Sequence, residues 1–414
     1  MRSRRPRASR HRLRVVGRRT GTSTRAVRRP LTPARLLRSP PRRSGIEAWS
    51  NLTDLEAAAR ARLPIDVWDY ISGGAGEERT LADNVEAFRH WAIRPHVLTG
   101  ASAIDLSTTL LGADVPVPFF VAPAAYLGGI HPSGEAAVAR AAGARGILAA
   151  FSMLSSRSIE EIAAASGAGP RWFQLYRQAA PDVSRRLVER AEAAGYRAIV
   201  LTADAPVLGV RDRQARKGFG IDPTPPLGNV PDIRSPPRTL ALEAGTFRVP
   251  RESSAGFEAI DEIRSWTRLP VLVKGILTAE DARRASEHGA SGVVVSNHGG
   301  RQLDGAIAAL DALPEVVREV GDQVEVYMDG GVRRASDILI ALAQGARAVG
   351  IGRPILWALA VGGAEGVGRY LDLLTRELVT AMAICGRTRI SEVDATLVVE
   401  RPSLRTGGGS ARTG

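Results

Sequence analysis

From about residue 115 onward, short apolar segments alternate with longer alanine-rich segments of helical character. The apolar segments lack the polar–apolar alternation of a half-exposed strand, which is typical of parallel strands buried on both faces. Strands that alternate with helices in this way predict an α/β fold. Eight of them favour a closed (β/α)8 TIM barrel over an open doubly wound sheet. The predicted strands cover residues 116–124, 146–152, 172–176, 198–204, 270–275, 292–298, 324–331 and 348–354.

Two helical segments precede the barrel and form a predicted N-terminal helical extension. Thr53 and Glu56 have the spacing of a capping box before an alanine-rich helix. A second helical segment follows at about residues 77–90.

The connection between the fourth and fifth predicted strands, residues 205–269, is long and rich in proline and glycine. Barrel connections are normally much shorter, so we expect this long loop after strand 4 to be a flexible lid over the barrel mouth. A disordered insertion without function is the alternative.

Charge divides the chain into an arm and a body. The formal net charge is +13, but residues 1–43 contain 16 arginines and no acidic residue, which leaves 40 basic against 43 acidic residues in the body. The excess charge therefore belongs to an arm and not to a basic binding face. We expect a disordered Arg-rich arm (1–45), a TIM barrel domain (46–400) and a flexible tail (401–414). For the arm, three roles stay open: a solvated or untranslated leader, a nucleic-acid or acidic-surface contact, and a targeting peptide.

Composition also bears on location. The sequence has no run of some 18 apolar residues, so we expect no membrane span. Cys385 is the single cysteine and cannot form an internal disulfide, which fits a reducing, cytoplasmic location. None of the motifs predicts a metal site.

Polar residues stand where the predicted strands end. In a barrel enzyme the active site lies at the carboxyl ends of the strands, so these positions are the candidates for chemistry. They are Gln174, Tyr176, Thr202, Asp204, Lys274, Ser296, His298, Asp329 and Arg353.

Two glycine-rich turns follow the seventh and eighth predicted strands, "MDGGVRRASD" and "GIGRP". Loops at these two strands form the usual phosphate site of barrels, where backbone N–H groups and a helix N-terminus offer positive charge. Arg333 and Arg353 would add charge-assisted hydrogen bonds. Together the turns predict phosphate binding.

The segment "SNHGGR" ends the sixth predicted strand. A histidine at a strand end is by itself most often structural, but two glycines allow His298 and Arg301 to face one pocket. A base of near-neutral pKa beside a fixed cation suits proton removal from a substrate whose carboxylate is clamped. Asp204 would orient the imidazole. Lys274 is one of only two lysines in the chain and is placed to stabilise negative charge on a cofactor.

Seven motifs carry a family resemblance: "WDYISGGAGEERTLADN", "WFQLY", "LTADAPVLGVRD", "LVKGILTAEDA", "SNHGGRQLD", "MDGGVRRASD" and "GIGRP". In this order they resemble the FMN-dependent α-hydroxy acid oxidase and dehydrogenase family, which includes glycolate, lactate and mandelate oxidases. The resemblance covers residues 50–395. It implies an FMN cofactor and oxidation of an L-2-hydroxy acid to the 2-oxo acid.

The resemblance also implies roles for individual residues. His298 would be the base, Asp204 its partner and Tyr176 the ligand of the substrate hydroxyl. Arg301, Arg211 and Tyr70 would hold the substrate carboxylate. The residues implied in flavin and phosphate binding are Pro123, Ala124, Ala125, Ser152, Gln174, Thr202, Lys274, Ser296, Asp329, Gly330, Gly331, Arg333, Gly352 and Arg353.

Two pocket residues bear on the substrate. Leu154 stands where glycolate oxidases carry a tryptophan, so the resemblance implies room for a bulkier acid. With Tyr126, the surrounding sequence is most similar to the mandelate and 4-hydroxymandelate oxidase branch, and a lactate-like substrate stays open. The family commonly forms tetramers. The electron acceptor can be oxygen, a quinone or a carrier protein.

Two alternatives belong to other classes. FMN barrels that isomerise isopentenyl diphosphate share the phosphate site, but they do not need His298 and Arg301 to clamp a carboxylate. A nucleic-acid-binding protein would depend on the basic arm alone, and we expect no nucleic-acid partner for the barrel.

Overall fold

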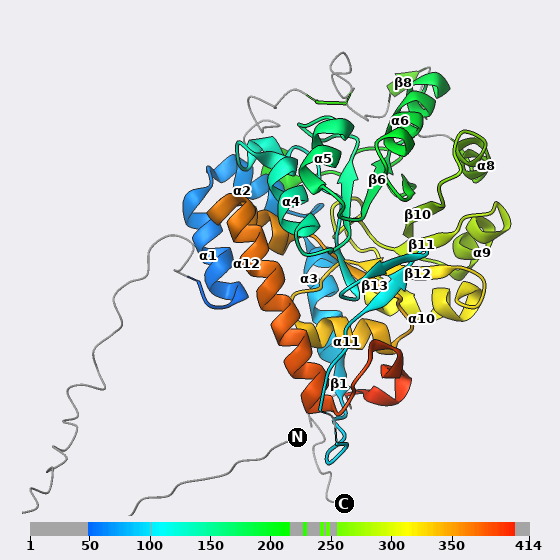
Figure 1. Cartoon of the computed structure of the whole chain (residues 1–414). Helices are drawn as coiled ribbons and strands as arrows, with labels where there is room; N and C mark the ends of the chain where they lie inside the picture. Colours follow the sequence, from blue (N-terminus) through cyan, green and yellow to red (C-terminus); the bar gives the residue numbers. More distant parts are fainter. Residues whose placement is uncertain are drawn as a thin grey trace, which may run out of the picture. The chain divides into compact units, whose positions relative to one another are not determined.

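The computed structural model describes residues 49–100, 102–215, 227–229, 241–243, 246–248 and 255–401. Eight parallel strands close into a barrel (Figure 1), in the order β10-β11-β12-β13-β4-β5-β6-β7. All eight predicted strands are confirmed, and the fold is a TIM barrel. The barrel strands are β4 (Phe119–Val121), β5 (Ala149–Ser152), β6 (Arg171–Leu175), β7 (Ile199–Thr202), β10 (Val271–Ile276), β11 (Gly292–Val295), β12 (Glu325–Asp329) and β13 (Ala348–Ile351).

The inside of the barrel is packed with side chains, not open. Phe120, Trp172 and Tyr327 meet there, with ring centroids 5.4 Å apart for the first two and 5.2 Å apart for the last two. Side chains alternate between the two faces of a strand, so every second residue joins this interior. The residues of this interior apolar layer are Phe120, Ala150, Trp172, Val200, Leu272, Val294 and Tyr327.

Helices surround the barrel because the outer faces of the strands are also apolar and need cover. The helices of the ring are α4 (Gly134–Gly143), α5 (Ile159–Ser166), α6 (Pro181–Ala193), α8 (Glu258–Arg264), α9 (Ala279–Glu287), α10 (Ala309–Val320), α11 (Ala335–Ala343) and α12 (Arg353–Cys385). Helix α12 contains two non-helical residues, Gly362 and Gly363, and packs along α4 and α1 (Figure 1). None of the helices in the described ranges is both long and apolar enough to cross a membrane.

The N-terminal helical extension is also present. It consists of α1 (Leu52–Arg62), α2 (Ile65–Ser72), α3 (Arg79–Glu86) and the 3-10 helix η3 (Ala87–His90). The predicted cap of the first helix is wrong, because Thr53 lies inside α1. Asn51 caps it instead, and its side-chain oxygen accepts a 2.9 Å hydrogen bond from Asp54 N. An Asn side chain reaches this N–H as readily as a Thr hydroxyl.

Short elements complete the fold outside the ring. Strand β1 (Trp91–Ile93) pairs antiparallel with β14 (Val398–Glu400), and β2 (Thr108–Leu110) pairs with β3 (Ala113–Val115). The remaining short elements are β8 (Ala241–Glu243), β9 (Thr246–Arg248), α7 (Asp212–Ala215), η4 (Leu127–Gly129), η6 (Ile390–Glu392) and η7 (Ala395–Leu397).

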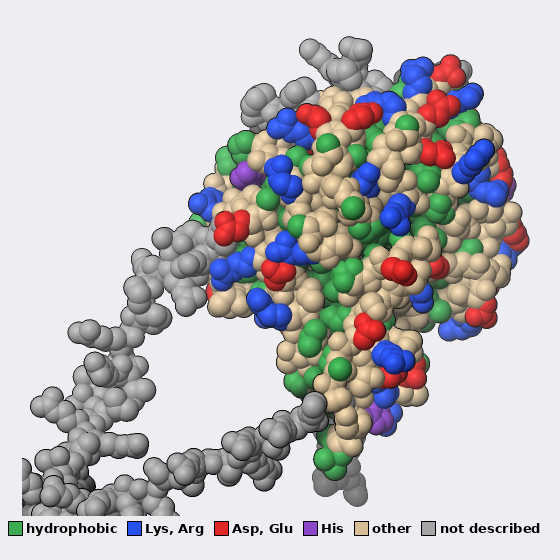
Figure 2. Space-filling model, in the orientation of Figure 1, with side chains coloured by type: hydrophobic (Ala, Val, Ile, Leu, Met, Phe, Trp, Pro, Cys, Tyr) green, Lys and Arg blue, Asp and Glu red, His purple; other side chains and the backbone are tan. Residues whose placement is uncertain are grey.

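Several expectations concern residues outside the described ranges. The basic arm, nearly all of the tail and most of the proposed lid are among them, so the domain division and the lid stay predictions. In the described body, Figure 2 shows basic and acidic side chains interspersed over the visible face. This mixture agrees with the near balance of charge outside the arm.

Candidate active site

Six polar side chains form a second layer in the barrel, two residues beyond the apolar layer on their strands. Side-chain alternation points them to the same interior. The parallel register sets Ser152 beside Gln174 and Thr202 beside Lys274, and Gln174 donates a hydrogen bond to Thr202. All six are buried, and this polar layer consists of Ser152, Gln174, Thr202, Lys274, Ser296 and Asp329.

A lysine lies at the centre of the polar layer. Lys274 Nζ donates to Ser296 Oγ at 2.6 Å and lies 3.1 Å from Asp329 Oδ2, while Ser296 Oγ donates to Asp329 Oδ1 at 2.5 Å. Burial by itself would lower the pKa of Lys274, but the negative charges of Asp329 and Asp204 outweigh it and raise the pKa above its ordinary value. Lys274 therefore stays protonated although it is buried, and its ammonium is paired with Asp329.

His298 and Asp204 form a partly buried acid–base pair at the barrel mouth. His298 Nδ1 lies 2.9 Å from Asp204 Oδ1. A carboxylate at Nδ1 fixes the ring and leaves Nε2 as the basic nitrogen. Burial by itself would raise the pKa of Asp204, but His298 and Lys274 outweigh it, and the pKa lies below its ordinary value. The carboxylate is therefore ionised and can stabilise an imidazolium.

Two backbone features bring this pair together. His298 adopts a positive φ of 58°, and its N–H donates to Ser296 Oγ at 3.1 Å. Gly275 interrupts the register of β10, and a Cβ atom there would lie 2.5 Å from Cβ of Asp204. Any side chain at residue 275 would push Asp204 away from the histidine.

A group of partly buried arginines lies around the same mouth. Arg301 donates to the carbonyls of Tyr70 at 2.7 Å and Gly73 at 2.9 Å, and its guanidinium lies 5.1 Å from the Tyr70 ring centre. Arg211 Nε donates to Arg301 O at 3.3 Å. Arginine and tyrosine groups thus converge from three separate segments of the chain.

Arg353 and Arg333 continue the group toward α12. Arg353 donates to the carbonyls of Gly299 at 3.0 Å and Gly73 at 2.8 Å, and Arg333 lies 5.5 Å from the ring centre of Trp357. Neither guanidinium has a carboxylate partner within 4.0 Å among the described residues.

The arginines repel one another. Burial, followed by repulsion from Arg301 and Arg333, holds the pKa of Arg353 well below its ordinary value. Burial and repulsion from Arg301 lower the pKa of Arg211 to about 10. Such a concentration of desolvated positive charge is unfavourable unless anions bind there. The site is therefore suited to anionic groups, such as a phosphate and a carboxylate.

The residues at the start of α12 fit a phosphate group. A Cβ atom at Gly352 would meet nothing within 4 Å, so there is open space directly before the helix N-terminus. Arg353 Nε is buried there without a hydrogen-bond partner in the described part of the chain. Gly330 and Gly331 adopt φ values of 110° and 78°, which only glycine adopts readily. Open space, helix dipole and an unpaired donor together fit the phosphate of FMN.

The predicted pocket residues lie in the loops after β4 and β5. Residues 123–125 begin two residues after the end of β4, and Tyr126 N donates to Leu154 O at 3.1 Å. The Tyr126 and Tyr70 rings stand edge to face, 6.4 Å apart. Tyr176 directly follows β6, and its N–H points to Met153 Sδ at 3.2 Å. The structure thus places the predicted substrate residues on neighbouring loops.

Sequence reasoning gave no role to two further polar residues, Asn84 and Glu78, although both lie within a quoted motif. Glu78 accepts from Gly74 N at 2.9 Å and pairs with Arg213, and it is an acid whose charge acts on Arg353. Asn84 bonds to Asn297, next to His298. Their presence in the motif that also contains Tyr70 was the available signal.

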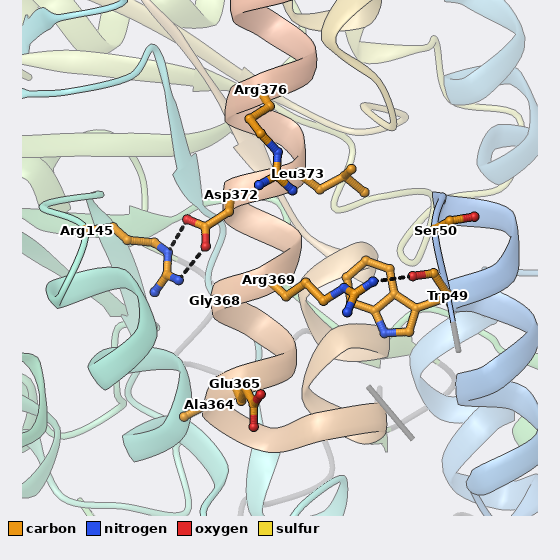
Figure 3. Close-up of a pocket in the computed structure, with 10 residues that line it drawn as sticks. All are labelled: Trp49, Ser50, Arg145, Ala364, Glu365, Gly368, Arg369, Asp372, Leu373 and Arg376. Atoms are coloured by element: carbon orange, nitrogen blue, oxygen red, sulfur yellow. Dashed lines mark hydrogen bonds and ion pairs between the residues drawn. The ribbon is translucent and has the colours of Figure 1, made fainter. Parts of the chain in front are cut away.

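A pocket of about 560 Å³ lies elsewhere, on the outer side of α12 (Figure 3). Arg145 and Asp372 form an ion pair of 2.6 Å at its edge, and Arg369 lies 4.8 Å from a ring centre of Trp49. None of the predicted site residues lines it. This pocket is therefore separate from the barrel mouth.

Comparison with known proteins agrees with this geometry. Residues 59–400 match the family described as FMN-dependent dehydrogenase. The chain belongs to this family. It is 44% identical to an L-lactate oxidase of Nostoc sp. over 355 residues, which are 84% of this chain and 97% of that protein.

Solved structures of the same family are similar throughout. A lactate oxidase of Pediococcus acidilactici has a TM-score of 0.79 and 38% identity, with 86% of this chain and 95% of that one covered. A mandelate oxidase variant with (S)-mandelic acid has a TM-score of 0.73 and 40% identity, with 83% and 97% covered. As a member of the FMN-dependent dehydrogenase family, the chain is an FMN-dependent oxidoreductase acting on the CH–OH group of a 2-hydroxy acid. The isomerase and nucleic-acid alternatives are not favoured.

Proposed function

We propose that this protein oxidises a bulky L-2-hydroxy acid, of the (S)-mandelate type, to the corresponding 2-oxo acid. The observation that carries this proposal is the His298–Asp204 pair beside partly buried arginines that lack carboxylate partners among the described residues. A base next to unsatisfied positive charge suits a substrate that is both an anion and a proton donor. A lactate-like acid is the second candidate, because a similar relative is an L-lactate oxidase.

The proposed roles follow from position. Arg301, Arg211 and the hydroxyl of Tyr70 bind the substrate carboxylate, and Tyr176 binds the substrate hydroxyl. Fixing both groups orients the α-carbon. His298 Nε2 then accepts one proton, and the ionised carboxylate of Asp204 stabilises the imidazolium.

FMN, when bound, would supply the two-electron oxidant and take up a hydride equivalent from the substrate α-carbon, while the other proton of the CH–OH group goes to His298. Lys274 would stabilise the negative charge that results, because its ammonium is buried and held protonated. Ser152, Gln174, Thr202 and Ser296 offer hydrogen-bonding groups in the barrel, with Pro123, Ala124 and Ala125 lining its mouth. Asp329, Gly330, Gly331, Arg333, Gly352 and Arg353 would hold the ribityl and phosphate end.

The pocket and the cellular setting are part of the same proposal. Leu154 and Tyr126 line the substrate side chain, and leucine leaves more room than tryptophan. Oxygen, a quinone or a carrier protein would reoxidise the flavin. We expect a homotetramer, by resemblance to the family, and a reducing cytoplasmic location, on the evidence of the single cysteine.

The visible spectrum of the purified protein tests the proposal, before and after anaerobic addition of (S)-mandelate. We expect a yellow oxidised-flavin spectrum that bleaches. Bleaching by L-lactate but not by mandelate would move the substrate assignment to the smaller acid. A colourless protein that takes up no added FMN would refute the proposed function.

A further inference from the structure

Glu135 is a fully buried carboxylate in the first turn of α4, with 0% of its surface exposed. No basic side chain lies within 4.0 Å of it in the described part of the chain. Its oxygens accept three hydrogen bonds instead. Glu135 Oε1 accepts from Leu127 N and from Ser156 N, both at 3.0 Å, and Oε2 accepts from Ser156 Oγ at 2.5 Å. Burying a carboxylate without a cation is costly, so the arrangement depends on all three donors.

The three donors come from two different loops. Leu127 belongs to the loop after β4, and Ser156 belongs to the loop after β5. A direct bond joins the same loops, since Gly128 N donates to Ser156 Oγ at 2.9 Å. Gly134 leaves room for this contact, because a Cβ atom there would lie 2.9 Å from Gly128 N. Glu135 is therefore the acceptor that holds the two loops at one separation.

These loops carry the residues proposed to line the substrate pocket. Tyr126 immediately precedes Leu127 and has a positive φ of 58°, and Leu154 lies two residues before Ser156. The 3.1 Å bond from Tyr126 N to Leu154 O links the pair directly. We propose that Glu135 is a positioning residue that sets substrate selectivity by fixing Tyr126 relative to Leu154. This inference rests on the proposed function.

Selectivity between a large and a small acid is the readout. Glu135→Ala leaves two backbone N–H groups and a hydroxyl without their acceptor, so the loops separate. An aromatic ring contacts both loops more extensively than a methyl group does. We expect the ratio of kcat/KM for (S)-mandelate over L-lactate to fall about tenfold, through KM, which is the usual scale for lost apolar pocket contacts. Flavin content and the kcat for lactate should stay near wild type.

Binding of the products gives a readout independent of turnover. Benzoylformate and pyruvate perturb the spectrum of oxidised flavin when they bind nearby, so their dissociation constants follow from titration. In Glu135→Ala the constant for benzoylformate should rise about tenfold and that for pyruvate much less. Glu135→Gln should restore the selectivity to within about threefold, because its amide oxygen still accepts the two N–H bonds.

Glu325 provides the matched control. It also accepts from a backbone N–H, that of Leu111 at 3.2 Å, and from a hydroxyl, that of Tyr327, but it lies at the start of β12, at the opposite end of the barrel. Glu325→Ala should lower the unfolding temperature and leave the mandelate-to-lactate ratio within about twofold. An equal change of the ratio in Glu325→Ala and Glu135→Ala would overturn the proposal, as would an unchanged ratio in Glu135→Ala.

A milder variant covers the case in which Glu135→Ala does not fold. Ser156→Ala removes one hydroxyl that joins Glu135 to Gly128. It should shift the ratio in the same direction by about threefold, and an unchanged ratio counts against the proposal. If the wild-type protein oxidises neither acid, the proposed function itself is refuted. If the wild-type protein is active but substitution of Glu135 leaves its selectivity unchanged, only the present inference is refuted.

Discussion

Asn84 and Asn297 exchange two side-chain hydrogen bonds of 2.8 Å, each amide donating to the oxygen of the other. The pair joins helix α3 to the loop that carries His298. Asn84 Oδ1 also accepts from Ala309 N at 3.1 Å, and Asn297 Oδ1 accepts from Gly300 N at 3.1 Å. The N-terminal extension is thereby part of the scaffold of the loop that carries His298.

Asn84→Ala tests this connection. The change leaves the buried amide of Asn297 and the N–H of Ala309 unsatisfied, so we expect a loss of about 1–3 kcal/mol in the free energy of unfolding. Because His298 also shifts, kcat should fall more than KM rises. Denaturant unfolding and steady-state kinetics measure the two effects. The control is Asn51→Ala, which removes the α1 cap at a cost of about 1 kcal/mol and should leave kcat unchanged.

His298→Ala should retain bound flavin and lose turnover by a factor of about 10² to 10⁴ or more, the range for a missing general base. His288 supplies the control, because it forms a similar pair with Asp261, Nδ1 to Oδ2 at 2.5 Å, on the surface. Turnover in His288→Ala should match wild type. An active His298→Ala protein would remove this residue from the proposed mechanism.

Asp204 should make stability depend on acid pH. Its pKa is depressed in the folded protein, so its contribution is fully present above the ordinary aspartate pKa and is lost as pH falls through the folded value. Asp204→Asn removes the ionisation. The difference in unfolding free energy between wild type and Asp204→Asn should therefore be largest near neutral pH and shrink below about pH 4. Urea titrations at several pH values measure it, and a difference that grows with acid would contradict the assignment.

Two adjacent arginines, Arg333 and Arg334, allow the effect of phosphate binding to be distinguished from the effect of surface charge. Arg333 is half-buried and lies 5.5 Å from the Trp357 ring centre, whereas Arg334 is exposed and reaches Glu377 at 3.6 Å. Arg333→Gln should raise the dissociation constant of FMN by about tenfold or more, equivalent to the loss of one charge-assisted hydrogen bond. Arg334→Gln should leave it within about twofold. Fluorescence titration of apoprotein with FMN distinguishes them, and equal effects would argue against a phosphate role for Arg333.

The polar residues at the strand ends were predictable, because the pattern of apolar segments shows where each strand ends. Lys274 and Asp329 stand at the ends of apolar segments, and a barrel brings such ends together whatever the loops do. The pairing of His298 with Asp204 followed from the same rule. The positions of the helical extension and of all eight strands were predictable for the same reason, since they depend on local pattern.

The roles of Asn84 and Glu135 were not predictable in this way. The partner of Asn84 is 213 residues away, and Glu135 resembles an ordinary acidic residue in the first turn of a helix. Only the fold shows that its carboxylate is turned inward. The prediction of Thr53 as the N-cap of α1 was wrong for a related reason. Asn51 and Thr53 are both acceptable N-cap residues, and the choice depends on where the chain enters the helix.

The polar layer and the pocket residues belong to different parts of the chain. Lys274 and Asp329 belong to strands, and a one-residue slip of either strand would turn its polar side chain out of the barrel. Tyr126 and Leu154 belong to loops that the strand register leaves unchanged. Under the proposed function, an exchange of these loops would therefore change which acid fits and would leave Lys274 and Asp329 in place.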